Sequence, residues 1–73
     1  MKHYQFTIIV QRDEQGNYLA ICPALQGCYA EGETPEEAVV YLKDVIQLHL
    51  EDRRARNEPI YEELFSERLD VAA

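Results

Sequence analysis

Two cysteines, Cys22 and Cys28, offer the widest choice of chemistry in this sequence. They could close a short loop as a disulfide, but structural disulfides are rare in cytosolic proteins. A zinc site needs about four ligands at recognised spacings, and the only further candidates, His3 and His49, lie far away in the sequence. We interpret the cysteines as two small buried thiols, with a redox pair and a metal site as the alternatives.

Carboxylates are the other candidates for chemistry, because two-metal phosphoryl transfer requires acidic side chains that converge on metals about 4 Å apart. The strand expected over residues 3–12 carries none. The acidic residues nearest to a cluster are expected in a turn and a helix cap, namely Asp13, Glu14, Glu36 and Glu37. Neither histidine has a Ser or Cys nearby at a recognised spacing. We therefore expect no enzyme: no catalytic residue, no metal site and no cofactor.

Charge and length restrict the protein class further. The chain has 73 residues, with 14 acidic and 7 basic side chains and a net charge of -7. We expect one domain over residues 1–73, without a C-terminal DNA-binding domain, and no membrane segment, which makes the cytoplasm the default location. A core this small gives marginal stability, so association into a dimer or a larger homo-oligomer is expected.

Two sets of side chains could contact nucleic acid. Arg53, Arg54 and Arg56 are interpreted instead as solvated charges that complement the end of a helix. The tyrosines lack interleaved basic residues and are interpreted as core and interface aromatics: Tyr4, Tyr18, Tyr29, Tyr41 and Tyr61. The acidic balance also opposes binding to phosphates, so no direct DNA binding is expected, whereas a basic protein partner would be attracted.

Alternating hydrophobicity predicts the strands that position these residues. Residues 3–12 alternate between apolar and polar side chains, residues 18–22 are apolar on both faces, and residues 28–31 form a short third strand. A turn around Gly16 joins the first two strands, and Pro23 ends the second because it has no N–H to donate. The three strands should form an antiparallel meander.

A long amphipathic helix should follow. Thr34 is the expected N-cap, Pro35 suits the first helical position, and Glu37 can complete a capping box. Apolar residues then recur every three or four positions to about Arg54, and the segment 57–59 ends the helix. Residues 65–71 alternate again and predict a fourth strand, giving strand order 3-2-1-4 if the helix is a right-handed crossover. The predicted fold is therefore α+β: a small, three- to four-stranded, mainly antiparallel sheet (β-β-β-α-β) with the helix on one face.

Three segments together resemble the HicB-like antitoxin family. They match its G-x-Y-x-A, P-x-L-x-G-C and G-x-T-x-E-E-A landmarks, in order and with correct gaps. The matching positions are Gly16, Tyr18, Ala20, Pro23, Leu25, Gly27, Cys28, Gly32, Thr34, Glu36, Glu37 and Ala38. Two loop residues depart from the family pattern, since Ala24 and Gln26 stand where the family often has Asp and Pro.

The resemblance implies a partly degraded ribonuclease-H-like fold and a partner, a small basic HicA-type toxin that cleaves messenger RNA and is inhibited by being bound. The residues that bind this partner are not identified by the sequence. Two classes of function follow. The chain is an antitoxin-type binding module, or it is a solitary homo-oligomeric module with a structural or regulatory role and no toxin partner.

Overall fold

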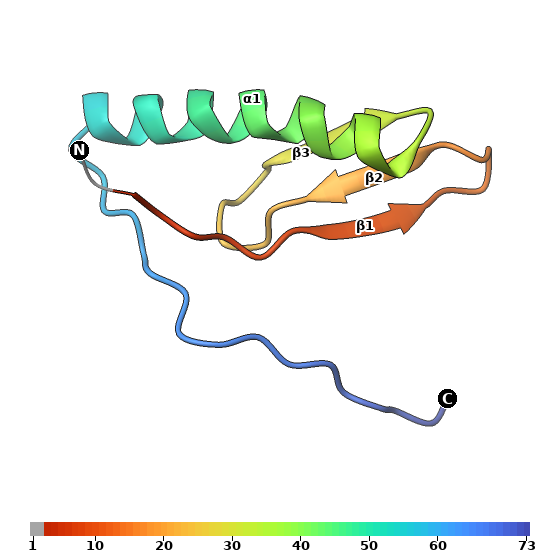
Figure 1. The fold of residues 1–73 in the computed structure, drawn as a ribbon. Helices are drawn as coiled ribbons and strands as arrows, with labels where there is room; N and C mark the ends of the chain where they lie inside the picture. Colours follow the sequence, from red (N-terminus) through yellow and green to blue (C-terminus); the bar gives the residue numbers. More distant parts are fainter. Residues whose placement is uncertain (1–2) are drawn as a thin grey trace.

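The computed structural model describes residues 3–73 and contains three strands followed by one long helix (Figure 1). The strands are β1 (Ile9–Arg12), β2 (Tyr18–Ile21) and β3 (Tyr29–Gly32), and the helix is α1 (Pro35–Ala55). The sheet is antiparallel in the order β1-β2-β3. The predicted α+β fold, a three-stranded meander with one helix on one face, is thus confirmed.

Strand β1 is shorter than the alternation over residues 3–12 predicted, and its register gives the reason. Ile9 lies opposite Ile21, so the same register would place Thr7 opposite Pro23. Proline has no N–H for the ladder, and pairing ends there. At the other end, Asp13 N–H donates to the Asn17 carbonyl over 2.9 Å, and Gly16 takes a φ of 88° in the turn.

Helix α1 begins with a side-chain cap. Thr34 Oγ1 accepts a hydrogen bond from Glu37 N–H over 3.1 Å, and Pro35 occupies the first turn. Glu37 Oε1 accepts from Glu33 N–H at 3.2 Å, one residue earlier than a standard capping box requires. Asn57, with a φ of 56°, marks the end of the helix.

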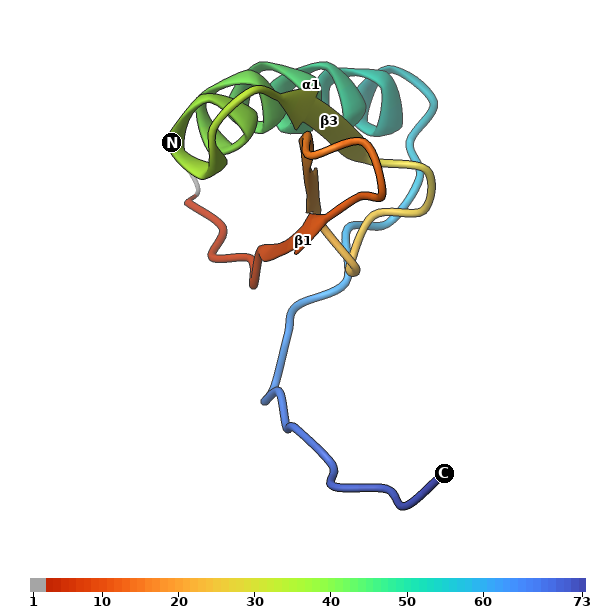
Figure 2. The ribbon, with the colours of Figure 1, turned by 90° about the vertical axis from the view of Figure 1, so that its right-hand side faces the viewer.

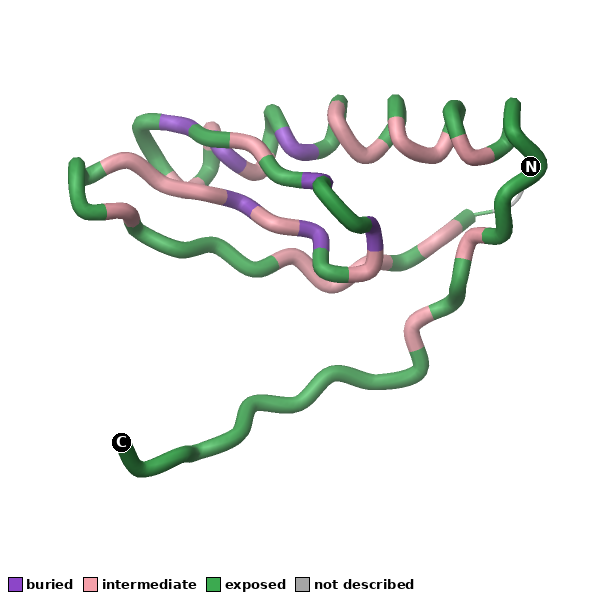
Figure 3. Tube along the Cα trace, turned by 180° about the vertical axis from the view of Figure 1, so that it is seen from behind, coloured by how far each residue is buried: buried purple, intermediate pink, exposed green. Residues whose placement is uncertain are grey.

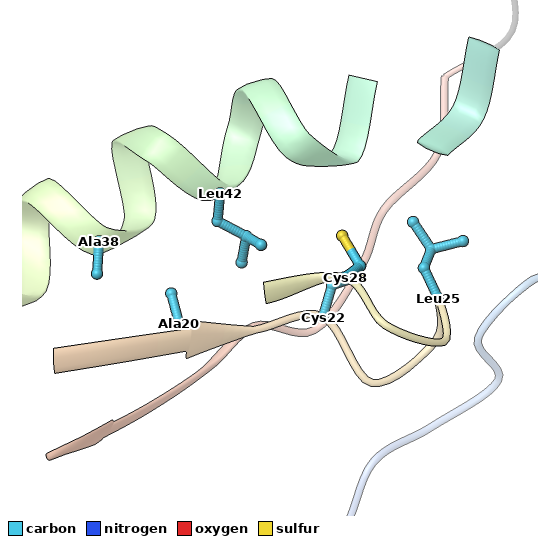
Figure 4. Packing of buried hydrophobic residues seen from close by; sticks show 6 residues of the cluster. All are labelled: Ala20, Cys22, Leu25, Cys28, Ala38 and Leu42. Atoms are coloured by element: carbon cyan, nitrogen blue, oxygen red, sulfur yellow. The ribbon is translucent and has the colours of Figure 1, made fainter. Parts of the chain in front are cut away.

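The core lies between α1 and the sheet and is small. Figure 4 shows its buried side chains between the helix and the strands: Ala20, Cys22, Leu25, Cys28, Ala38 and Leu42. The helix lies above β3 and β2, whereas β1 forms the sheet edge farthest from it (Figure 2). Much of β1 consequently stays exposed, including Ile9 and Val10.

Gly32 allows the close contact between β3 and the start of α1. A Cβ atom at this position would lie 2.5 Å from the backbone nitrogen of Ala38. That neighbour is helix backbone and cannot move aside as a flexible side chain would. The absence of a side chain at Gly32 therefore sets how closely the helix approaches the sheet.

The fourth strand predicted over residues 65–71 does not form. These residues belong to a C-terminal segment, coloured blue in Figure 1, that leaves the body beside the residues preceding β1 and runs away from it in an extended conformation. Figure 3 shows the segment exposed along nearly its whole length. Alternation makes a chain suitable for pairing, but a strand also requires a neighbouring edge about 4.8 Å away, and none of the strands in residues 3–73 pairs with this segment.

Replacing Gly32 by Ala should destabilise the fold by about 1–3 kcal/mol, because the new methyl group overlaps helix backbone. The measurement is urea unfolding followed by circular dichroism. Glu31→Ala, on the exposed preceding residue, is the matched control and should stay within about 0.5 kcal/mol of the parent. Equal stability of the two variants would contradict the close-contact explanation.

Candidate partner-binding surface

The landmark residues of the hairpin and the helix start serve local structure. Asp13 Oδ1 accepts hydrogen bonds from the N–H groups of Gln15 and Asn17, each over 2.9 Å, and so holds the turn that Gly16 completes. Glu37 is engaged at the helix cap. Among residues 3–73, no group of three or more His, Cys, Asp or Glu side chains is arranged to hold a metal ion.

The two cysteines face each other at the end of the β2–β3 pair. Cys22 N–H donates to the Cys28 carbonyl over 3.0 Å, and both thiols are free and buried. Burial, followed by the effect of Cys22, raises the pKa of the Cys28 thiol to about 11. Burial also raises the pKa of Cys22. Both thiols are therefore protonated at neutral pH and are poor nucleophiles.

The loop between the cysteines is held by its own backbone. Leu25 N–H donates to the Cys22 carbonyl, and Cys28 N–H donates to the Leu25 carbonyl, each over 3.1 Å. The Leu25 side chain is buried in the core, and Gly27 adopts a φ of 75°. Pro23 and Gln26 remain at the surface of this loop.

Arg53 and Arg56, near the end of α1, have local partners. Arg56 forms ion pairs with Asp52 at 3.2 Å and with Glu58 at 3.7 Å, while Arg53 donates to the Pro59 carbonyl over 3.2 Å. Near the start of the helix the potential is negative. The charge of Glu37, aided by partial burial and a hydrogen bond from the hydroxyl, raises the pKa of Tyr41, and Glu33 adds to the shift.

An apolar row crosses the sheet face that α1 leaves open. The register aligns Ile9, Ile21 and Tyr29 side by side on this face. Tyr29 is 58% exposed and Ile9 is 44% exposed. A shallow groove of about 290 Å³ begins here and continues under the loop of residues 23–27, with Leu19 and Ile21 among its walls. An exposed apolar groove with a polar surround is typical of a protein-binding surface.

Comparison with known proteins identifies the family. The sequence profile described as "HicB_like antitoxin of bacterial toxin-antitoxin system" matches residues 6–69. The chain belongs to the HicB-like antitoxin family. A UPF0150 protein of Synechocystis sp. is 35% identical over 60 residues, which cover 82% of this chain and 76% of the relative. A UPF0150 protein of Thermoplasma acidophilum is 38% identical over 56 residues, covering 77% and 81%. No solved structure matches the chain significantly.

Within this HicB-like chain, the family landmarks overlap the groove at Pro23, Leu25, Gly27 and Cys28, whereas the row of Ile9, Ile21 and Tyr29 contains no landmark residue. Ala20, Leu25, Cys28 and Ala38 are buried, and Gly32 is covered by the helix. The sequence predicted one helix on one face of the sheet, which leaves the opposite face, where Ile9 lies, without a helix. It did not locate the groove, whose shape depends on the loop conformation.

Sequence reasoning also missed a contact between the chain's two ends. Thr7 N–H donates to Glu63 Oε1 over 2.8 Å, and Thr7 Oγ1 donates to Glu63 Oε2 over 2.7 Å. These two bonds lower the pKa of the Glu63 carboxyl. They fix the start of the C-terminal segment beside the residues that lead into β1. No sequence motif indicated that Thr7 and Glu63 are in contact, since 56 positions separate the two residues.

The contact between Thr7 and Glu63 should depend on pH. Because the pKa of Glu63 is lowered in the folded chain, the contact is complete above the ordinary carboxyl value and is lost as the pH falls through the lowered one. The Thr7 amide chemical shift in an NMR titration reports this step. Glu63→Gln should remove it, whereas Glu62→Gln at the exposed neighbouring position should leave its midpoint unchanged. A titration of Thr7 that persists in Glu63→Gln would assign it to another group.

Proposed function

We propose that this chain is a non-catalytic binding module that neutralises a small basic HicA-type toxin, an mRNA-cleaving protein, by forming a complex with it. The observation that carries the proposal is the family match over residues 6–69, because it spans the sheet, the helix and most of the C-terminal segment. Complex formation in the cytoplasm, with no direct contact to DNA and no metal or cofactor, is part of this proposal. The ribonuclease-H-like ancestry of the fold stays a prediction.

Charge would bring the partners together. A toxin that grips RNA must present positive charge, and the chain carries a net charge of -7. Opposite fields accelerate encounter, and added salt weakens them. Acidic residues on the outer side of α1, such as Asp44 and Glu51, are exposed and available for this steering.

Apolar contact would set how long the complex lasts. Exposed charges at the rim of an interface contribute little to its lifetime, whereas a desolvated centre contributes most. The row of Ile9, Ile21 and Tyr29 beside the groove is the most suitable centre on the sheet, because it is apolar, aligned and uncovered. We therefore assign the toxin-binding role to the open face of the sheet.

The second candidate function is a homo-oligomeric module without a toxin. It is favoured by the small core and by the large apolar side chains that stay exposed on the C-terminal segment. The neighbouring reading frame distinguishes the two, since a short basic HicA-like chain beside this one supports the antitoxin function. We propose self-association in both cases.

Tyr29→Lys should weaken a toxin complex at least tenfold through faster dissociation, because it places a charge in the apolar centre. Val40→Lys is the matched control: Val40 on α1 is 57% exposed against 58% for Tyr29, so both variants add one charge at an equally exposed site. Asp44→Lys and Glu51→Lys should instead slow association modestly. The measurements are co-purification with the product of the adjacent frame and binding kinetics at several salt concentrations.

An RNA-cleavage assay completes this test. The toxin should cleave RNA alone and lose that activity when the chain is added, while the chain alone with magnesium should leave RNA intact. Failure to form a complex at micromolar concentration, or a complex that cleaves RNA at the full rate, would reject the antitoxin function. Magnesium-dependent cleavage by the chain alone that disappears in Asp13→Ala or Glu37→Ala would reject the non-catalytic one.

A further inference from the structure

The C-terminal segment, residues 64–71, combines apolar side chains with exposed backbone. Leu64, Phe65, Leu69 and Val71 are 89%, 81%, 77% and 76% exposed. Within the described chain, no hydrogen bond or ion pair involves any of these residues. Such a run of alternating, unpaired residues is suited to join a sheet.

Strand β1 offers the complementary surface. It is the edge strand of the sheet and, among the residues that the structure describes, pairs only with β2, so half of its peptide groups point away from the ladder. All four of its residues are exposed. The strand contains neither a proline nor an inward charge of the kind that usually protects a sheet edge, apart from Arg12 at its end.

The path of the C-terminal segment leaves a space beside this edge. The two bonds between Thr7 and Glu63 hold the segment at the entrance to β1, and beyond Glu63 the two diverge, as Figures 1 and 3 show from opposite sides. The space between them measures about 500 Å³. Residues 7–10 line one side of it and residues 66–68 line the other. An additional extended strand has unpaired backbone available on both of its sides here.

We propose that the C-terminal segment of a second copy of this chain fills this space, antiparallel to β1, and that the exchange is reciprocal. The resulting sheet has the order β1, partner segment, own segment, partner β1 across a two-fold axis. Both C-terminal segments then form strands, and the two free β1 edges are paired. This inference rests on the self-association proposed above and is independent of the toxin.

Symmetry favours a second copy over another occupant. In each chain the segment runs in the direction of its own β1 (Figure 1), so a two-fold axis between two such segments makes every neighbouring pair antiparallel. A stable interface buries roughly 1,200–2,000 Å² in total, and the two exchanged segments supply eight exposed large apolar side chains for such burial, four from each copy.

Light scattering tests the association. The full chain should be a dimer at micromolar concentration. Ser66→Pro removes an N–H that has no hydrogen-bond partner in the described part of the chain, and Leu69→Lys charges the apolar side of the segment. Each should raise the dissociation constant at least tenfold. Ala72→Lys, outside the alternating run, is the control for added charge. Circular dichroism should be nearly the same for all variants when monomeric, since residues 64–71 make no hydrogen bond or ion pair with the rest of residues 3–73.

Spin labelling tests which copy provides the strand. A nitroxide on Ser66→Cys is selective because Cys22 and Cys28 are buried. When the spin-labelled chain is mixed with a nitrogen-15-labelled chain that carries no nitroxide, the nitroxide should broaden the NMR signals of the β1 amides in the nitrogen-15-labelled chain.

A monomeric full chain would overturn both the exchange and self-association. A dimer that Ser66→Pro and Leu69→Lys leave intact, or one without broadening at β1, would overturn the exchange alone. Neither result affects the toxin assay, which uses the open sheet face.

Discussion

The structure depends on one constraint: a single helix packs on a three-stranded sheet and covers only part of it. The size of the core and the positions of the exposed apolar surfaces both result from this incomplete coverage. Because Gly32 has no side chain, the start of α1 can pack closely against β3. The helix lies over β3 and β2, and β1 remains at the edge of the sheet. The buried core contains only small and medium side chains, with Leu25 and Leu42 the largest. A core of this size stabilises a domain only modestly. Both the open sheet face and the β1 edge therefore remain as apolar surface that association can bury.

The family landmarks are explained mainly by this packing. Gly16 and Gly27 adopt positive φ values, Gly32 admits the helix, Thr34 caps it, and Leu25 ties the loop to the core. These requirements are local and chemically strict, which is why the motifs are legible in a single sequence. The apolar row of Ile9, Ile21 and Tyr29 contains none of these residues, although Leu25 and Gly27 also line the groove beside it. Recognition of the family from its landmarks therefore identifies the fold more directly than it identifies the binding residues.

Features that depend on residues close in sequence could be predicted, whereas features that depend on residues far apart in sequence could not. The turn, the cap and the 3.6-residue period depend on neighbours in sequence, so β2, β3 and α1 were predicted within a residue or two of their positions. Strand β1 was predicted too long because its limit is set across the sheet, at Pro23. The fourth strand was predicted from alternation alone, but pairing depends on an available edge. The bonds between Thr7 and Glu63 join distant residues and left no local signal.

The net charge of the chain has opposite effects on self-association and on binding to a basic toxin. Two copies of a chain with a charge of -7 repel each other, so self-association must draw on apolar burial and backbone pairing. Salt screens this repulsion and should strengthen the homo-oligomer. A basic toxin is attracted by the same charge, and salt should weaken that encounter. The two associations thus respond to ionic strength with opposite signs, because one net charge opposes the first and assists the second, while the apolar surfaces contribute to both.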